Sequence, residues 1–159
     1  MFTPGPGELL LLFLVAAGLL TTGCRPQAEP PPGPPKTGLV ATLSLDRQQV
    51  RPGESVQLTL LVENRGPHPV PATFRSGQSF DFLVREERGE VWRWSHDRVF
   101  TLALRQPTLP PGWSETYQAN WEGKDNEGRP VKPGDYQVLG IFTISPPLIS
   151  KPVTLHITQ

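Results

Sequence analysis

The sequence contains a single cysteine and carries no net charge, and both features limit what it can be. With one cysteine in 159 residues, no disulfide can form within the chain, so a folded domain must be held by its apolar core. Fifteen basic residues balance fifteen acidic ones, which gives no electrostatic basis for binding nucleic acid. The length and the 36% hydrophobic content are sufficient for one domain with such a core.

Motifs that carry catalysis are also missing. The sequence contains no HExxH, CxxC, P-loop or GxSxG pattern. Ser95, His96 and Asp97 have the residue types of a hydrolytic triad, but three consecutive residues cannot converge on one reacting atom, because neighbours on an extended chain point in opposite directions. We therefore expect a protein that is not an enzyme, with no cofactor and no small-molecule substrate.

The one long apolar run covers residues 9–20, and its twelve residues are too few to span a bilayer comfortably. Its length is typical of a signal peptide, although residues 1–8 contain no Lys or Arg. The run ends in L-T-T-G-C, where small residues before Cys24 resemble the bacterial lipobox, in which the cysteine thiol receives a diacylglycerol. We expect a protein exported to the cell envelope and lipid-anchored to a membrane through Cys24. The alternative is an ordinary secretory signal followed by an incidental cysteine.

The segment after Cys24 is rich in proline and shows no apolar periodicity. Residues 25–38 hold six prolines in fourteen positions, which favours a semi-extended spacer of roughly 40 Å at about 3.1 Å per residue. The predicted organisation is a lipoprotein-type signal peptide over residues 1–23, a Pro-rich tether over residues 24–38, and a folded domain over residues 39–159.

The predicted domain consists of short alternating segments separated by turn residues, and none of them has the 3.6-residue period of a helix. The expected strands cover residues 39–45, 55–63, 70–75, 80–85, 90–95, 99–105, 113–121, 135–145 and 151–158. Strands of this length at about ten-residue spacing are typical of an all-β fold. We expect an immunoglobulin-like antiparallel β-sandwich of about 7–9 strands.

Aromatic residues concentrate in the middle of the domain. Phe80, Phe82 and Val84 alternate with polar positions, a polar turn follows, and Trp92 and Trp94 fall on one face of the returning strand, which together predict a β-hairpin. The pair of tryptophans has two interpretations. Either they pack into the core with Arg93 on the other face, paired with Asp81 or Glu115, or the W-R-W unit is an interface hot spot. Aromatic pairs on a strand are usually buried, which favours the first.

The loop W-E-G-K-D-N-E-G-R-P-V-K-P-G-D-Y, residues 121–136, resembles a connection found in bacterial Ig-like domains. Its glycines permit positive φ at turns, and Val131 and Tyr136 return to the core. Its acidic residues lack the spacing of an EF-hand, so we expect a solvated turn and no metal site.

Several motifs of the central region also resemble one known family. S-G-Q-S-F-D-F, G-E-V-W-R-W-S, the F-T-x-A-L pattern and L-P-P-G-W-S-E-T-Y are similar to the BsuPI-type intracellular proteinase inhibitor domain. The resemblance implies binding to a serine protease. The family name describes a cytosolic target, whereas a chain with a signal peptide would meet a protease of the envelope or outside the cell.

These observations leave two functional hypotheses. The first is a membrane-anchored, non-catalytic domain that binds a protein partner and inhibits a serine protease of the envelope. The alternative is an Ig-like structural or interaction module of the envelope that inhibits nothing. With the tryptophans inward, binding falls mainly to two loops, residues 85–90 and 123–133. The candidate partner-binding residues are Arg85, Glu86, Glu87, Arg88, Arg93, Lys124, Asp125 and Asn126.

Overall fold

The computed structural model describes residues 38–159, so the predicted signal peptide, Cys24 and nearly all of the tether lie outside the described part. Eleven strands and no helix form this part, and it accordingly holds no helix long and apolar enough to cross a membrane. The strands are β1 (Leu39–Leu45), β2 (Gln49–Val50), β3 (Val56–Asn64), β4 (Val70–Pro71), β5 (Phe80–Glu86), β6 (Gly89–Arg93), β7 (Thr108–Leu109), β8 (Ser114–Trp121), β9 (Gly134–Phe142), β10 (Leu148–Ile149) and β11 (Val153–Ile157).

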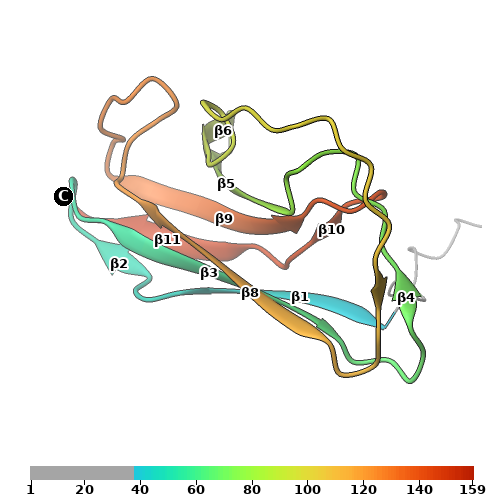
Figure 1. Cartoon of the computed structure of the whole chain (residues 1–159). Coiled ribbons are helices and arrows are strands. Elements are labelled where there is room, and N and C mark those ends of the chain that lie inside the picture. Colours follow the sequence, from blue (N-terminus) through green and yellow to red (C-terminus); the bar gives the residue numbers. More distant parts are fainter. Residues whose placement is uncertain (1–37) are drawn as a thin grey trace, which may run out of the picture. The chain divides into compact units, whose positions relative to one another are not determined.

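The strands form two layers, visible in Figure 1. One sheet has the order β1-β3-β8, and the other has the order β2-β11-β9-β5-β6 with β10 beside β9. The short pair β4-β7 stands apart as a third sheet. All pairs are antiparallel except β2 with β11, which run parallel. The predicted all-β, Ig-like sandwich is therefore confirmed, with this one parallel pair as a departure from the expected antiparallel arrangement.

The core lies between the two sheets because their strands alternate apolar and polar residues. Strand β3 shows this most clearly, since Val56, Leu58, Leu60 and Val62 are fully buried while the residues between them are more exposed. Phe82 from β5 and other apolar residues of β9 and β11 meet them from the opposite sheet. The period-two pattern of the sequence thus decides which face of each strand is buried.

A row of aromatic rings runs through this core from Trp94, just after β6, to Phe74 in the segment between β4 and β5. Its members, in order of contact, are Trp94, Phe80, Tyr117, Phe142 and Phe74. Their successive ring centroids lie 4.3, 4.7, 6.1 and 5.2 Å apart, which are distances at which aromatic pairs attract. Burial, together with the neighbouring Glu115, raises the pKa of the Tyr117 hydroxyl well above its ordinary value. We call this set the aromatic row.

Two predicted strands differ from the structure. The segment 70–75 pairs as a strand only over Val70–Pro71, then makes an isolated bridge at Phe74. The segment 99–105 is not a strand at all, apart from a bridge between Arg105 and Phe74. The reason is the turn at residues 94–97, after which the chain leaves the edge of the β5-β6 hairpin instead of continuing beside it.

Gly140 on β9 provides a test of how tightly the two sheets pack. A Cβ atom at this position would lie 2.7 Å from Leu60 Cδ1 and 3.3 Å from its Cγ, and Leu60 is itself fully buried. We predict that Gly140→Ala lowers the free energy of unfolding by about 1–3 kcal/mol through overpacking, measured by chemical denaturation. In a Leu60→Ala background, which provides the missing space, the same change should cost much less. An equal cost in both backgrounds would show that the contact with Leu60 is not the cause.

Candidate functional site

The predicted partner-binding residues lie on two loops, the turn of the β5-β6 hairpin and the loop between β8 and β9. Glu86, Glu87 and Arg88 are exposed at the hairpin turn, where Gly89 adopts a φ of 131°. Arg85 just before the turn donates to Gln137 Oε1 on β9, at 3.1 Å from Nε and 2.9 Å from Nη2. The hairpin turn thus presents a charged, solvated surface on a backbone that is fixed at its base.

Asn126 joins the two loops. Its side-chain oxygen accepts from the backbone N–H of Arg93 at 2.8 Å, and its Nδ2 donates to Glu90 at 3.2 Å. Its own backbone N–H donates to the carbonyl of Val91 at 3.0 Å. These three bonds lie along β6, which is the edge strand of its sheet, so its outward-facing backbone groups have no neighbouring strand to pair with. The two loops proposed from the sequence therefore form one continuous surface.

The loop between β8 and β9 is held by its own polar groups. Asp125 Oδ1 accepts from the backbone N–H groups of Glu127 and Arg129, and Oδ2 pairs with Arg129 Nε at 2.8 Å. Trp121 Nε1 donates to the carbonyl of Lys124 at 2.7 Å. Lys124 in turn pairs with Glu122 at 2.8 Å. Within residues 38–159 no group of three His, Asp or Glu side chains is placed to hold a metal.

Arg93 lies between two carboxylates. Its Nη1 is 3.0 Å from Asp81 Oδ2, and its Nη2 is 2.8 Å from Glu90 Oε2. The hydrogen bond from Arg93 holds the pKa of Glu90 below its usual range, and the Glu90 carboxylate in turn raises the pKa of Arg93. The predicted pairing with Asp81 is confirmed. The alternative partner Glu115 was wrong, because β8 lies in the other sheet.

Asp81 departs from the simple alternation of β5. Its position on the outer face of the strand predicts exposure, yet only 4% of it is accessible. Ser95 covers it, donating from Oγ to Asp81 Oδ2 at 2.6 Å and from its backbone N–H to Oδ1 at 3.1 Å. The hydroxyl of Ser95, the first residue of the Ser95-His96-Asp97 sequence, is therefore used in a structural hydrogen bond.

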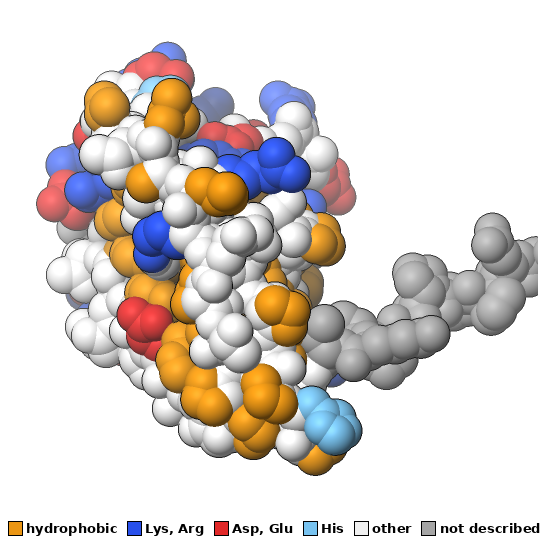
Figure 2. All heavy atoms as spheres, turned by 45° about the vertical axis from the view of Figure 1, so that its right-hand side comes forward, with side chains coloured by type: hydrophobic (Ala, Val, Ile, Leu, Met, Phe, Trp, Pro, Cys, Tyr) orange, Lys and Arg blue, Asp and Glu red, His pale blue; other side chains and the backbone are white. Residues whose placement is uncertain are grey.

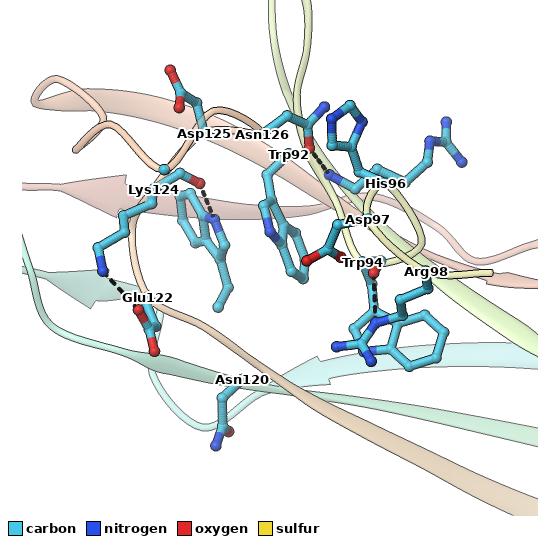
Figure 3. Close-up of a pocket in the computed structure, with 13 residues that line it drawn as sticks. Trp92, Trp94, His96, Asp97, Arg98, Asn120, Glu122, Lys124, Asp125 and Asn126 are labelled. Atoms are coloured by element: carbon cyan, nitrogen blue, oxygen red, sulfur yellow. Dashed lines mark hydrogen bonds and ion pairs between the residues drawn. The ribbon is translucent and has the colours of Figure 1, made fainter.

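Trp92 and Trp94 point toward the core, as the first interpretation expects. Trp92 lies 6.4 Å from buried Trp121, measured between ring centroids, and Trp94 lies 4.3 Å from Phe80. The outer edges of Trp92 and Trp94 line a pocket of about 330 Å³, which lies between the turn that follows β6 and the loop after β8 (Figure 3). In this view Arg98 lies against Trp94, and Lys124 reaches toward Glu122.

The structure also presents a feature that the sequence-based reasoning missed. Residues 96–107 connect β6 to β7 as an irregular segment, which we call the connector. It carries the three most exposed large apolar side chains of residues 38–159, with exposed fractions of 99% for Val99, 95% for Leu102 and 69% for Leu104. Figure 2 shows the side of the molecule along which the connector runs, with apolar side chains reaching the surface. The sequence contains one signal for this feature, the uncharged run V-F-T-L-A-L at residues 99–104, but that run also has the composition of a strand.

An Ig-like β-sandwich is the class of protein that the fold defines. A family model described as the BsuPI intracellular proteinase inhibitor matches residues 43–146, which is more than half of the chain. The chain belongs to this family, and the resemblance seen in its motifs is confirmed. The match includes the hairpin turn, the connector and the loop after β8.

Solved structures show similar folds at low identity. An alkylpurine DNA glycosylase of Pseudomonas fluorescens, bound to DNA containing an abasic site analogue, is 12% identical, with 77% of this chain and 31% of that chain covered and a TM-score of 0.48. The CARDB domain of a Pyrococcus furiosus protein is 12% identical over 77% and 94%, with a TM-score of 0.47. The Bacillus subtilis sporulation control protein Spo0M is 15% identical over 77% and 50%, with a TM-score of 0.47. No curated protein matches the chain.

The link through Asn126 leads to a prediction. Asn126→Ala removes the acceptor of the Arg93 amide and one partner of Glu90, so the free energy of unfolding should fall by about 1–3 kcal/mol in chemical denaturation. Hydrogen exchange at the Arg93 amide should accelerate by more than the global loss of stability requires. Asn120→Ala is the matched control, because Asn120 is exposed on β8, and its change should stay within about 0.5 kcal/mol. Unchanged exchange at Arg93 would contradict the proposed link.

Proposed function

We propose that this protein is a non-catalytic inhibitor that binds a serine protease of the cell envelope. The observation that carries the proposal is the match of the BsuPI proteinase inhibitor model to residues 43–146. Membership of this family supports a protease as the partner in general. The serine class of the protease and its place in the envelope come from the resemblance and from the signal-like N-terminal residues.

The arrangement of polar groups supports binding rather than catalysis. The Ser95 hydroxyl donates to Asp81, and burial raises the pKa of the Tyr117 hydroxyl above its ordinary value. Charged groups of β6 and of the loop after β8 form ion pairs, as in Arg93 with Glu90 and Asp125 with Arg129. Such pairs fix the shape of a surface, which is what a rigid binding domain requires. Arg85, Glu86, Glu87, Arg88 and the other residues predicted from the sequence remain candidates for contacts on this surface.

The location of the protein is part of the same proposal. The L-T-T-G-C sequence favours export and attachment of a lipid to Cys24, and residues 25–38 favour a spacer between that lipid and the domain. A lipid-anchored inhibitor would meet proteases on the outer side of the membrane. This location differs from the cytosolic target that the family description implies.

Lipid attachment has a direct test, because Cys24 is the only cysteine of the chain. We expect the complete protein, expressed in a bacterial host, to fractionate with membranes and to incorporate labelled fatty acid. Cys24→Ser should abolish the label and move the protein out of the membrane fraction. A wild-type protein that is exported but unlabelled would instead support the alternative of an ordinary secretory signal.

Inhibition is tested by titration. The complete protein, purified in detergent, is added to subtilisin, chymotrypsin and trypsin, and hydrolysis of a small chromogenic peptide is followed. We expect a stoichiometric loss of activity in at least one protease, and a bound protease when the protein is used to capture partners from envelope extract. Unchanged activity in all three, with recovery of an assembly that contains no protease, would favour the Ig-like interaction module without inhibitory activity.

A further inference from the structure

The connector is attached to the aromatic row at its first end. The Arg98 guanidinium lies over the Trp94 ring at 4.3 Å from its centroid, and Arg98 Nε donates to the Trp94 carbonyl at 2.9 Å. Phe100 turns inward, with its ring 6.0 Å from that of Trp94. Cation–π and aromatic contacts of this kind hold a segment without any strand pairing.

The second end of the connector is attached to the opposite end of the same row. Arg105 lies over the Phe74 ring at 4.5 Å, and its backbone exchanges two hydrogen bonds with Phe74, at 2.8 and 3.0 Å. Its guanidinium also faces a short run of acceptors. These are the carbonyl oxygens of Ser76, Gly77 and Gln78 and the Oγ of Ser79, at 3.1 to 3.4 Å. Arg105 therefore fixes the segment to the loop that precedes β5.

A third attachment lies between these two. The N–H of Gly77 donates to the carbonyl of Thr101 at 2.9 Å. Gly77 is needed for this approach, because a Cβ there would lie 2.6 Å from Thr101 Oγ1. The connector is thus attached at Arg98, Thr101 and Arg105, and Val99, Leu102 and Leu104 between these points are exposed to solvent.

The exposed residues between these attachments are apolar. Val99 and Leu102 are almost completely exposed and Leu104 is mostly exposed, while residues 99–104 contain no charge. A leucine at 95% exposure forgoes the stabilisation that burial of its side chain would provide. Exposed apolar side chains on a segment that is already ordered lower the entropic cost of docking, because little conformational freedom is lost on binding. Three exposed large apolar side chains within six residues favour an interaction site over the isolated apolar residues that are common on surfaces.

We propose that the connector is the segment that occupies the substrate cleft of the inhibited protease, with Leu102 in an apolar specificity pocket. This inference rests on the proposed function and names the inhibitory segment and the class of protease. Extended peptides bind by pairing their backbone with an exposed strand edge, while individual side chains fill pockets. Leu102 suits the pocket best because it is more exposed than Leu104, at 95% against 69%, and, unlike Val99, is not branched at Cβ. The binding is non-covalent.

The two charged loops complete the interface as its rim. His96, Asp97 and Arg98 at the start of the connector line the same pocket as Lys124 and Asn126. Binding interfaces commonly have an apolar centre and a polar, solvated edge. The connector supplies such a centre, whereas the hairpin turn supplies exposed charged groups and the loop after β8 supplies ion pairs such as Asp125 with Arg129.

Substitution of Leu102, the residue assigned to the specificity pocket of the protease, tests this assignment. Trypsin has an acidic specificity pocket and chymotrypsin has a hydrophobic one, so Leu102→Arg should exchange the preference of the inhibitor. With the complete protein, we expect wild type to inhibit subtilisin or chymotrypsin, and L102R to inhibit the same protease about 10- to 100-fold more weakly. L102R should also gain inhibition of trypsin. Leu102→Gln, an uncharged change of similar size, should weaken inhibition without that gain.

Ile149→Arg is the matched control, because Ile149 is a half-exposed apolar residue on β10, outside the connector. It should inhibit like wild type, and thermal unfolding should show all variants folded.

If wild type inhibits but L102R, L102Q and I149R inhibit equally well, the connector assignment is overturned while the proposed function stands. If wild type inhibits none of the proteases, the proposed function fails and the assignment with it. A wild-type dimer that L102R converts to a monomer, with unchanged inhibition, would show that the connector binds a second copy of the chain.

Discussion

The stacking of aromatic rings between the two sheets is the interaction on which the rest of the structure depends. Phe80 from β5 and Phe142 from β9 belong to one sheet, and Tyr117 from β8, in the other sheet, lies between them. The row therefore crosses the interface of the sandwich and links the hairpin to both layers. A chain without a disulfide has no covalent means of fixing these layers, so the large area buried by the rings does so instead.

The same row determines where the irregular part of the chain can go. Its terminal rings, Trp94 and Phe74, are each covered by an arginine of the connector. The connector needs no strand partner because its ends rest on the faces of rings that are already fixed by the core. The packing of the core therefore affects the position of the connector, because a movement of Trp94 or Phe74 would also displace the exposed leucines.

The long strands could be predicted from the sequence because each carries its own alternation. In β3 the buried and exposed positions follow from V-Q-L-T-L-L-V without any knowledge of neighbours. The two-residue strands β2 and β7 could not be predicted, since β2 pairs with β11 and β7 pairs with β4, each distant in the sequence. Residues 99–105 have the composition of a strand, and only the turn before them and the two arginine contacts make them a connector.

The candidate site could likewise be predicted only in part from the sequence. Polar, glycine-containing composition was sufficient to propose the hairpin turn and the loop after β8, and charge complementarity was sufficient to propose Arg93 with Asp81. The link through Asn126 depends on the position of β6 at the edge of its sheet, which no local pattern predicts. The burial of Asp81 likewise depends on Ser95, which is brought over it by the turn that follows β6. Contacts between distant segments thus convert separate polar loops into one surface.

The contact between Arg98 and Trp94 also gives the molecule an optical property. Indole emission responds to nearby charge and to solvent, and here a guanidinium lies directly over one indole at the start of the connector. The other three indoles belong to different surroundings, with Trp121 fully buried, Trp92 packed against it and Trp113 packed against Phe142. Trp94 therefore reports on the connector and Trp121 reports on the core, so a single chain carries separate natural fluorophores for occupancy of its surface and for integrity of its fold.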